Sequence, residues 1–150
     1  MKVFIAGGTG FIGQALIRKL LREGHAVTAL ARNPAKLGEL SGQVRTVPGS
    51  PLITGPWQQE VAGHEAIINL TGASIFTRWT PAAKQMILES RIAATRNIVE
   101  AIPAQADSPL TLINTSASGF YGPCQDEEKF ETDPPGSDFL VNRRGIMTPL

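Results

Sequence analysis

Hydrophobic positions along the chain change their spacing in a regular order. The residues Lys2–Ala6 are mostly apolar at consecutive positions. Ile12, Leu16 and Leu20 then recur at four-residue spacing, and the stretch 14–23 contains no glycine. A short run of consecutive apolar residues indicates a buried strand, whereas a spacing of three or four residues indicates an amphipathic helix. The start of the chain therefore predicts a strand followed by a helix, which ends at Gly24.

The alternation between short apolar runs and amphipathic stretches continues to residue 114. A long helix is predicted from Pro81, after the N-cap Thr80, to about Ala101. Its apolar stripe is predicted at Leu88, Ile92, Val99 and Ile102, further strands at 25–31, 43–47, 65–70 and 110–114, and short helices at 34–40 and 57–62. Strands alternating with helices favour an α/β fold with right-handed crossovers. We expect one domain over residues 1–150, a doubly wound parallel sheet with helices on both faces and strand order 3-2-1-4-5.

A glycine-rich turn separates the first strand from the first helix. Gly7, Gly10 and Gly13 recur at three-residue spacing in GGTGFIG. Between a strand and a helix this spacing predicts a Rossmann-like dinucleotide site, in which the glycines allow a tight turn, close approach to a pyrophosphate and close helix packing. The phosphates would lie at the positive end of the helix. The alternative is a turn that only connects the two elements. The predicted cofactor contacts are Gly7, Thr9, Gly10, Phe11, Ile12 and Gly13.

The cofactor preference is predicted from the end of the second strand. Dinucleotide domains that select NAD carry an acidic residue there, which holds the ribose 2′-hydroxyl. No Asp or Glu occurs between Gly24 and Gly38, and Arg32 stands at the expected place, followed by Asn33. A guanidinium pairs with a 2′-phosphate, and the Asn33 amide can donate to the same group. The sequence therefore favours NADP(H); the alternatives are a surface arginine and a turn asparagine.

Composition and charge narrow the classes of function. The 14 Lys and Arg residues against 13 Asp and Glu residues give a formal charge of +1, which offers no footprint for nucleic acid or an anionic membrane. No apolar run approaches the ~20 residues of a membrane span, and no signal peptide is recognised. The single cysteine, Cys124, cannot form an internal disulfide, so we expect a reducing cytoplasm. No metal site is predicted, because metal-ligand spacing is absent.

With these residues in place, the chain resembles an extended or atypical short-chain dehydrogenase/reductase. More narrowly, it resembles the sugar-epimerase-like branch called epimerase family proteins, the NAD-dependent epimerase/dehydratase family. The resemblance implies a Rossmann domain with NADP bound across the strand ends. It places Leu70 beside the cofactor and Thr71, Gly72 and Ala73 along the nicotinamide half. The matching segments are GGTGFIG at 7–13, ARNP at 31–34, NLTGA at 69–73, RWT at 78–80, SR at 90–91, SASGFYG at 116–122, PPG at 134–136 and DF at 138–139.

The resemblance also implies catalytic residues after the fifth strand. In this superfamily a serine orients the substrate oxygen, a tyrosine exchanges a proton, and a lysine four residues later lowers the pKa of the tyrosine. Tyr121 is the only tyrosine, and the residue four positions beyond it is Gln125. When Tyr121 is set on the family pattern, the serine position falls on Ala117. Ser116, Ser118 and Tyr121 are therefore the catalytic candidates, and the alternative for Tyr121 is a packing residue in a turn.

The resemblance implies a longer chain, with a substrate-binding region after residue 140. We therefore expect this chain to be a truncated or frame-shifted form that carries only the nucleotide-binding half. We also expect a homodimer, because the last strand would have an uncovered edge. The first functional hypothesis is an NADP(H)-binding oxidoreductase or epimerase-like domain that passes hydride to or from a small carbonyl or sugar substrate. The alternatives are a non-catalytic NADP(H)-binding module or redox sensor, and a structural α/β domain.

Overall fold

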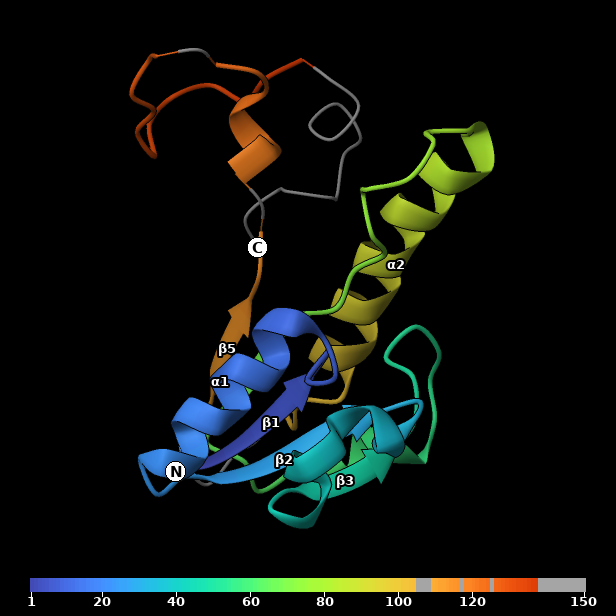
Figure 1. Cartoon of the computed structure of the whole chain (residues 1–150), viewed down its shortest axis with the longest axis vertical. Helices are drawn as coiled ribbons and strands as arrows, with labels where there is room; N and C mark the ends of the chain where they lie inside the picture. Colours follow the sequence, from blue (N-terminus) through green and yellow to red (C-terminus); the bar gives the residue numbers. More distant parts are fainter. Residues whose placement is uncertain (105–108, 117, 125, 138–150) are drawn as a thin grey trace.

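A five-stranded parallel sheet forms the centre of the computed structural model, which describes residues 1–104, 109–116, 118–124 and 126–137 (Figure 1). The strand order is β3-β2-β1-β4-β5, so the predicted order is confirmed. Each neighbouring pair is parallel, and β1 pairs with both β2 and β4. The strands are β1 (Lys2–Ala6), β2 (Ala26–Ala31), β3 (Arg45–Pro48), β4 (Ala66–Asn69) and β5 (Thr111–Asn114).

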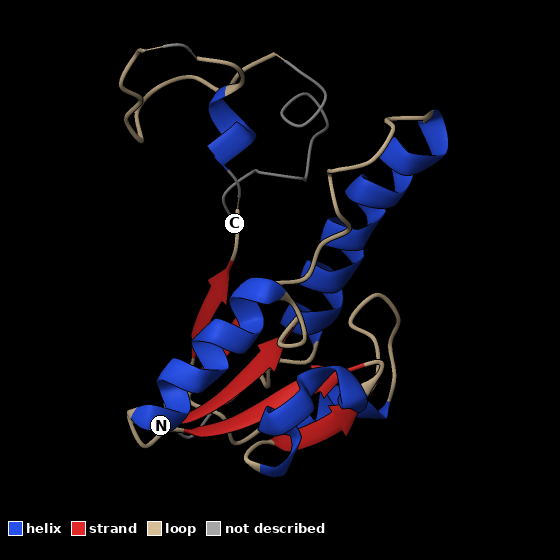
Figure 2. Ribbon diagram, in the orientation of Figure 1, coloured by secondary structure: helices blue, strands red, loops and turns tan. Residues whose placement is uncertain are grey.

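Helices cover both faces of the sheet, as predicted (Figure 2). One face is covered by α1 (Phe11–Arg22) and the 3₁₀ helix η1 (Pro34–Gly42). The other face is covered by the end of α2 (Pro81–Glu100) and the 3₁₀ helix η2 (Pro56–Val61). A further short 3₁₀ helix, η3 (Ser118–Tyr121), follows β5 and lies beyond the end of the sheet (Figure 1).

Each face of the sheet has its own hydrophobic core. Ile5 of β1 packs in the core that contains Ile17 of α1, whereas the preceding residue, Phe4, packs in the core that contains Trp57 and Ile98. Successive side chains of a strand point to opposite faces, so a strand covered on both sides needs apolar residues at consecutive positions. This requirement explains the uninterrupted apolar run at the start of the chain.

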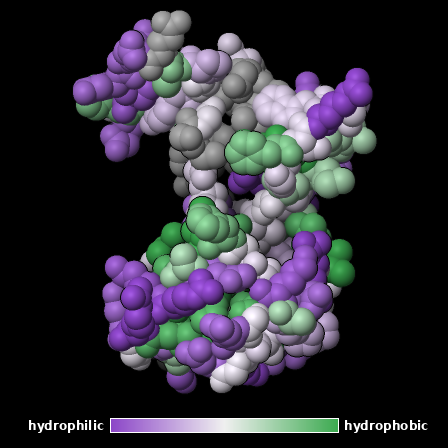
Figure 3. Space-filling view, viewed as in Figure 1, coloured by the Kyte–Doolittle hydropathy of each residue, from purple (hydrophilic) through white to green (hydrophobic). Residues whose placement is uncertain are grey.

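The first turn of α1 differs from the prediction in which side chains it buries. The helix begins at Phe11, and Gly10 is its N-cap. Ile12 was expected on the apolar face, but its side chain is 67% exposed. Figure 3 shows apolar surface gathered over this end of α1. The helix N-terminus lies directly beside the glycine turn.

The buried face of α2 also differs from the predicted stripe. Val99 was expected to be buried and is 40% exposed, whereas the polar residues Ser90 and Asn97 are buried. These two side chains are buried because they bond to loop backbone: Ser90 Oγ accepts from the Ala73 N–H at 3.0 Å, and Asn97 Nδ2 donates to the Pro51 carbonyl at 2.8 Å. Within the described ranges, no helix combines the length and hydrophobicity needed to cross a membrane.

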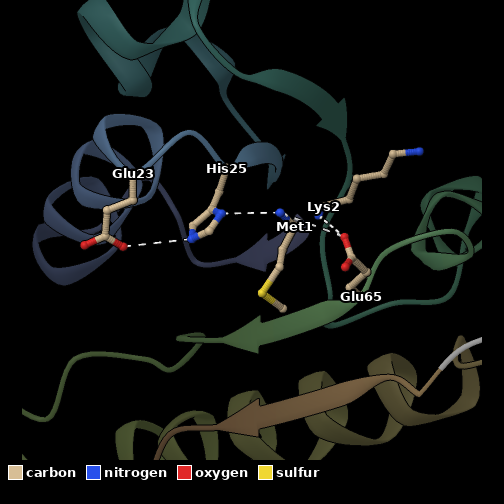
Figure 4. A network of polar contacts seen from close by, with 5 residues as sticks. All are labelled: Met1, Lys2, Glu23, His25 and Glu65. Carbon is tan, nitrogen blue, oxygen red and sulfur yellow. Dashed lines mark hydrogen bonds and ion pairs between the residues drawn. The ribbon is translucent and has the colours of Figure 1, made fainter.

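Polar contacts fix the amino ends of the strands (Figure 4). The Glu65 carboxylate accepts from the Lys2 backbone N–H at 2.6 Å and lies 4.0 Å from the terminal ammonium of Met1. That ammonium lies 3.3 Å from Nδ1 of His25, whose Nε2 is 3.9 Å from the Glu23 carboxylate. The network connects β1 to β4 and to the end of α1, so His25 serves the fold at the end of the sheet opposite the glycine turn.

Candidate cofactor-binding site

Close backbone packing shapes the glycine turn between β1 and α1. Gly7 has a φ of 84°, a conformation that side chains disfavour, and a Cβ there would lie 2.8 Å from the carbonyl carbon of Leu70. Gly13 packs against the backbone of the same turn, so that its Cβ would collide with the Gly7 carbonyl oxygen and lie 2.7 Å from Cα of Gly8. The sequence LTGA after β4 is therefore in direct contact with the turn after β1. The turn occupies the carboxyl edge of the sheet, where open α/β sheets bind ligands.

The N-terminus of α1 has the properties of an anion site. Its N-cap, Gly10, provides no side chain to bond the first-turn N–H groups, and the first turn contains no acidic residue. Free N–H groups and the positive end of the helix dipole favour a phosphate at this point. A Cβ on Gly10 would meet only the Gly7 oxygen, at 3.4 Å, so the space outside this residue is open. Phe11 and Ile12 follow with exposed side chains.

A cavity of about 250 Å³ adjoins the turn. Its lining combines the glycine turn, the end of β2, the loop after β3, the loop after β4 and one side of α2. The structure thus brings together predicted residues from three separate segments, while Gly10, Phe11, Ile12, Gly13, Asn33 and Leu70 do not line this cavity. The predicted residues that line it are Gly7, Thr9, Arg32, Thr71, Gly72 and Ala73.

Thr71 carries an unusual feature of this cavity. Its hydroxyl oxygen is fully buried and has no hydrogen-bond partner among the described residues. Leaving a buried hydroxyl unpaired costs about 1–3 kcal/mol, so such groups are rare unless a ligand or water completes them. The residue lines the cavity beside the glycine turn, where a polar group of a ligand can accept or donate this hydrogen bond. The site therefore has a polar group that fits a bound ligand.

The loop after β4 is held in place from two sides. Oδ1 of the buried Asn69 accepts from the Thr71 N–H at 3.0 Å, and its Nδ2 donates to Asn114 Oδ1 at 2.7 Å. On the other side, Ser90 of α2 accepts from the Ala73 N–H and donates to the Ile87 carbonyl at 3.0 Å. Sequence reasoning assigned no role to Asn69 or Ser90. The available signal was their polarity at positions that strand and helix packing would bury.

Arg32 and Asn33 follow β2 at the rim of the cavity. Both side chains are exposed, and Arg32 lines the cavity with the Gly49 and Ser50 backbone region of the next loop. Asn33 is the N-cap of η1, where its Oδ1 accepts from the Ala35 N–H at 3.1 Å. The side-chain oxygen of Asn33 is thus used by the fold, and the guanidinium of Arg32 is the cation that the cavity offers.

The catalytic candidates lie apart from this cavity. Ser116 is exposed after β5, and Ser118 and Tyr121 delimit η3. The Tyr121 ring stacks edge-to-face on Phe120, with ring centroids 5.2 Å apart, which matches the alternative interpretation of Tyr121 as a packing residue. Within the described part of the chain, no hydrogen bond joins Ser116 to Tyr121, and Gln125 and Ala117 lie outside the described residues. The structure does not bring these residues together into a catalytic group.

The segment after η3 carries charge of its own. The Lys129 ammonium donates to the Glu127 carboxylate at 2.6 Å, and this hydrogen bond lowers the pKa of Glu127 and raises the pKa of Lys129 from their usual values. Both groups are at the surface. Cys124 is a free, exposed thiol, and no cluster of metal-ligating side chains occurs among the described residues. These groups form a surface loop rather than an addition to the cavity.

Comparison with known proteins places the chain among epimerase family proteins. The sequence pattern of the NAD dependent epimerase/dehydratase family matches residues 3–141. This chain belongs to that family. Epimerase family protein YfhF from Bacillus subtilis (strain 168) is 41% identical over 138 residues, which cover 92% of this chain and 44% of that protein. The chain spans less than half the length of the curated relatives that it matches.

Solved structures of epimerase family members have the same fold. The human epimerase family protein SDR39U1 (isoform 2), crystallised with NADPH, superposes with a TM-score of 0.70 at 28% identity and covers 93% of this chain and 44% of its own. UDP-glucuronic acid 4-epimerase from Bacillus cereus, solved with UDP-glucuronic acid and NAD, gives a TM-score of 0.72 over 91% of this chain and 46% of its own; at 21% identity this likeness shows the fold alone. The chain therefore has the NAD(P)-binding Rossmann fold of the short-chain dehydrogenase/reductase epimerases.

Proposed function

We propose that this chain binds NADP(H) in the cavity beside the glycine turn. The observation that carries the proposal is the buried Thr71 hydroxyl without a partner among the described residues, because Thr71 lines the same cavity as Arg32 and the glycine turn. A dinucleotide phosphate supplies the two kinds of group that would complete this cavity, a polar partner for the hydroxyl and an anion for the guanidinium. Human SDR39U1 was crystallised with NADPH, which supports NADP(H) as the cofactor of this chain.

Each part of the cofactor has residues that would hold it. The N–H groups at the start of α1 would bind the pyrophosphate, and Arg32 would pair with the 2′-phosphate. Asn33 would contribute its side-chain amide N–H groups, because its oxygen already caps η1. Thr71, Gly72 and Ala73 share the cavity with Arg32. The family resemblance assigns these three residues to the nicotinamide half of the cofactor.

We propose a reductase or epimerase role for the site, with a small carbonyl or sugar substrate. A nicotinamide cofactor supplies hydride transfer when bound. Ser116, Ser118 and Tyr121 would orient the substrate and exchange its proton, since they follow β5 at the carboxyl edge of the sheet. The relatives are more than twice as long as the part of them that this chain matches. The activity is therefore proposed for this chain from its site and its family.

A second candidate is a binding module without catalysis, such as a redox sensor. The specific observation in its favour is the missing lysine four residues after Tyr121, where the sequence has Gln125. In addition, Tyr121 has its ring packed on Phe120 and makes no side-chain hydrogen bond among the described residues. Carbonyl and nucleotide-sugar substrates tested with NADPH distinguish the candidates: turnover supports the enzyme, and binding without any turnover supports the module.

Calorimetric titration with NADPH and NADH tests the proposed cofactor. We expect tighter binding of NADPH, and we expect Arg32→Ala to weaken NADPH by about tenfold or more while NADH changes by less than about threefold, because only NADPH carries the 2′-phosphate. Arg18→Ala is the matched control, since Arg18 lies on α1 outside the cavity and bonds to Gln14. A preference for NADH, or an equal loss for both cofactors in Arg32→Ala, would overturn the NADP(H) assignment.

A further inference from the structure

A second arginine lies against the loop after β4. Arg91 of α2 is partly buried, and its guanidinium packs so closely on Gly72 that a Cβ there would lie 3.1 Å from Cζ and 3.2 Å from one terminal nitrogen. Because Gly72 has no side chain, the guanidinium can pack directly on the loop. Arg91 does not line the cavity that contains Arg32. It approaches the loop from outside that cavity.

The neighbours of Arg91 on α2 show where this contact lies. Thr95, one turn further along the helix, donates from its hydroxyl to Asn114 Oδ1 at 3.2 Å and lies 3.5 Å from Nδ2 of Asn69. These asparagines are the last residues of β5 and β4. Residues four apart lie above one another on a helix, about 6 Å apart along its axis. The start of α2 extends beyond the strand ends (Figure 1), so Arg91 lies one turn outside the point where β4 and β5 end.

The charge of Arg91 is not neutralised within the described residues. An arginine on a helix face commonly pairs with an acidic neighbour, but no hydrogen bond or salt bridge of Arg91 is present among these residues. A guanidinium that is held by packing, rather than by a carboxylate, keeps its N–H edges for an external anion. The chain continues from the end of β5 into the catalytic candidates, and Ser116 follows β5 by two residues.

We infer that Arg91 binds the anionic group of the substrate, a carboxylate or a phosphate ester, at the mouth between β4 and β5. The inference rests on the proposed NADP(H)-binding function, which assigns the two phosphate sites of the cofactor to α1 and Arg32. Arg91 is then a second arginine and a third anion site at the carboxyl edge, on the β5 side of the Gly72 loop. Such a residue makes the site favour acidic substrates over neutral ones, because a neutral analogue forms no ion pair with the guanidinium.

Nuclear magnetic resonance on the full chain tests the inference with inorganic phosphate as the probe. The Arg91 Nε–H signal, assigned by its loss in Arg91→Lys, and the Gly72 amide are followed during titrations with and without saturating NADPH. We expect both signals to shift saturably in the NADPH-bound protein. Arg91→Gln should weaken the phosphate-dependent shift of Gly72 by about tenfold or more. Arg96→Gln, an exposed arginine on the same helix, should leave it unchanged.

Each other outcome decides against the inference in a recognisable way. If NADPH binds and phosphate leaves the Arg91 and Gly72 signals unmoved, the substrate-anion site is wrong while the cofactor proposal stands. If phosphate competes with NADPH, and Arg91→Gln weakens NADPH itself by about tenfold, the guanidinium serves the cofactor pyrophosphate instead. Equal shifts of the Arg91 and Arg96 signals mean unspecific ion binding. If NADPH fails to bind, the proposed function fails, and the titration without cofactor still shows whether Arg91 takes phosphate.

Discussion

The cavity beside the glycine turn and the segment after β5 contrast in how the fold holds them. The cavity takes residues from the ends of β1, β2 and β4, which are joined by parallel pairing and packed over two buried cores. The described residues between 116 and 137 contact one another, as in the hydrogen bond from the Gly136 N–H to the Phe120 carbonyl at 2.9 Å and the edge-to-face rings of Phe120 and Tyr121.

This difference separates binding from catalysis. Groups that are fixed before a ligand arrives bind it without a cost of ordering, and the glycine turn, Thr71 and Asn69 are fixed in this way. Ser116 and Tyr121 are not joined to one another or to the loop after β4 by any hydrogen bond among the described residues. The residues that would bind a dinucleotide are therefore held in place more firmly than those that would carry out a reaction. Substitutions in the cavity should change cofactor binding more than substitutions in the segment after β5.

Gly13→Ala should damage the cavity region most. The new Cβ would lie 2.7 Å from Cα of Gly8 and collide with the Gly7 carbonyl, where only backbone could move. We expect NADPH affinity to fall by about 100-fold or more, and the free energy of unfolding to fall by about 1–3 kcal/mol, the range for overpacking. Calorimetry and urea unfolding measure the two effects. Gly42→Ala is the control, because nothing lies within 4 Å of its Cβ; an equal loss in both variants would contradict the packing explanation.

Asn69→Ala should weaken the same region through its support. The Thr71 N–H would lose its acceptor, at a cost of about 1–3 kcal/mol, whereas the exposed Asn114 would keep its bond from the Thr95 hydroxyl. We expect lower stability and about tenfold weaker NADPH binding, measured by urea unfolding and calorimetry. Asn114→Ala is the matched comparison, because it leaves the bond to Thr71 in place. NADPH affinities that fall equally in the two variants would rule out a specific role for Asn69 in holding the loop.

Thr71→Val should change stability and affinity in opposite directions. Removing the buried, unpaired hydroxyl should raise the free energy of unfolding of the free protein by about 1 kcal/mol, whereas NADPH should bind a few-fold more weakly. Thr115→Val provides the contrast, because the Thr115 hydroxyl donates to the Asn69 carbonyl at 2.8 Å and its loss should destabilise the protein. Unchanged NADPH affinity in Thr71→Val would mean that the hydroxyl does not face the cofactor.

Tyr121→Phe should have the smallest effect on binding. The hydroxyl makes no hydrogen bond among the described residues, and the ring contact with Phe120 would be kept. We expect NADPH affinity within about twofold of the unmodified protein and a stability change within about 0.5 kcal/mol, as for surface substitutions. The same calorimetric and unfolding experiments apply. A large loss of affinity would show that the segment after β5 takes part in cofactor binding and would remove the contrast between the two regions.

The sequence predicted the parts of the fold that depend on neighbouring residues. Consecutive apolar positions at Lys2–Ala6 and the glycine spacing after them are local signals, and the first strand and the glycine turn followed from them. The strand order followed from the alternation of strands and helices along the chain. The face of α2 was mispredicted because Ser90 and Asn97 are buried through bonds to loops distant in sequence. The same holds for the site: the roles of Asn69 and Arg91 depend on partners that only the folded sheet brings together.

Hydrogen exchange of the full chain with and without NADPH tests the central claim most directly. The account predicts slower exchange with NADPH at residues 7–13, 31–33 and 69–73, and little change between residues 116 and 137. Arg32→Ala should need about tenfold or more NADPH for the same protection. Protection confined to the segment after β5, or no protection at the glycine turn and the loop after β4, would contradict the claim that this cavity is the NADP(H) site.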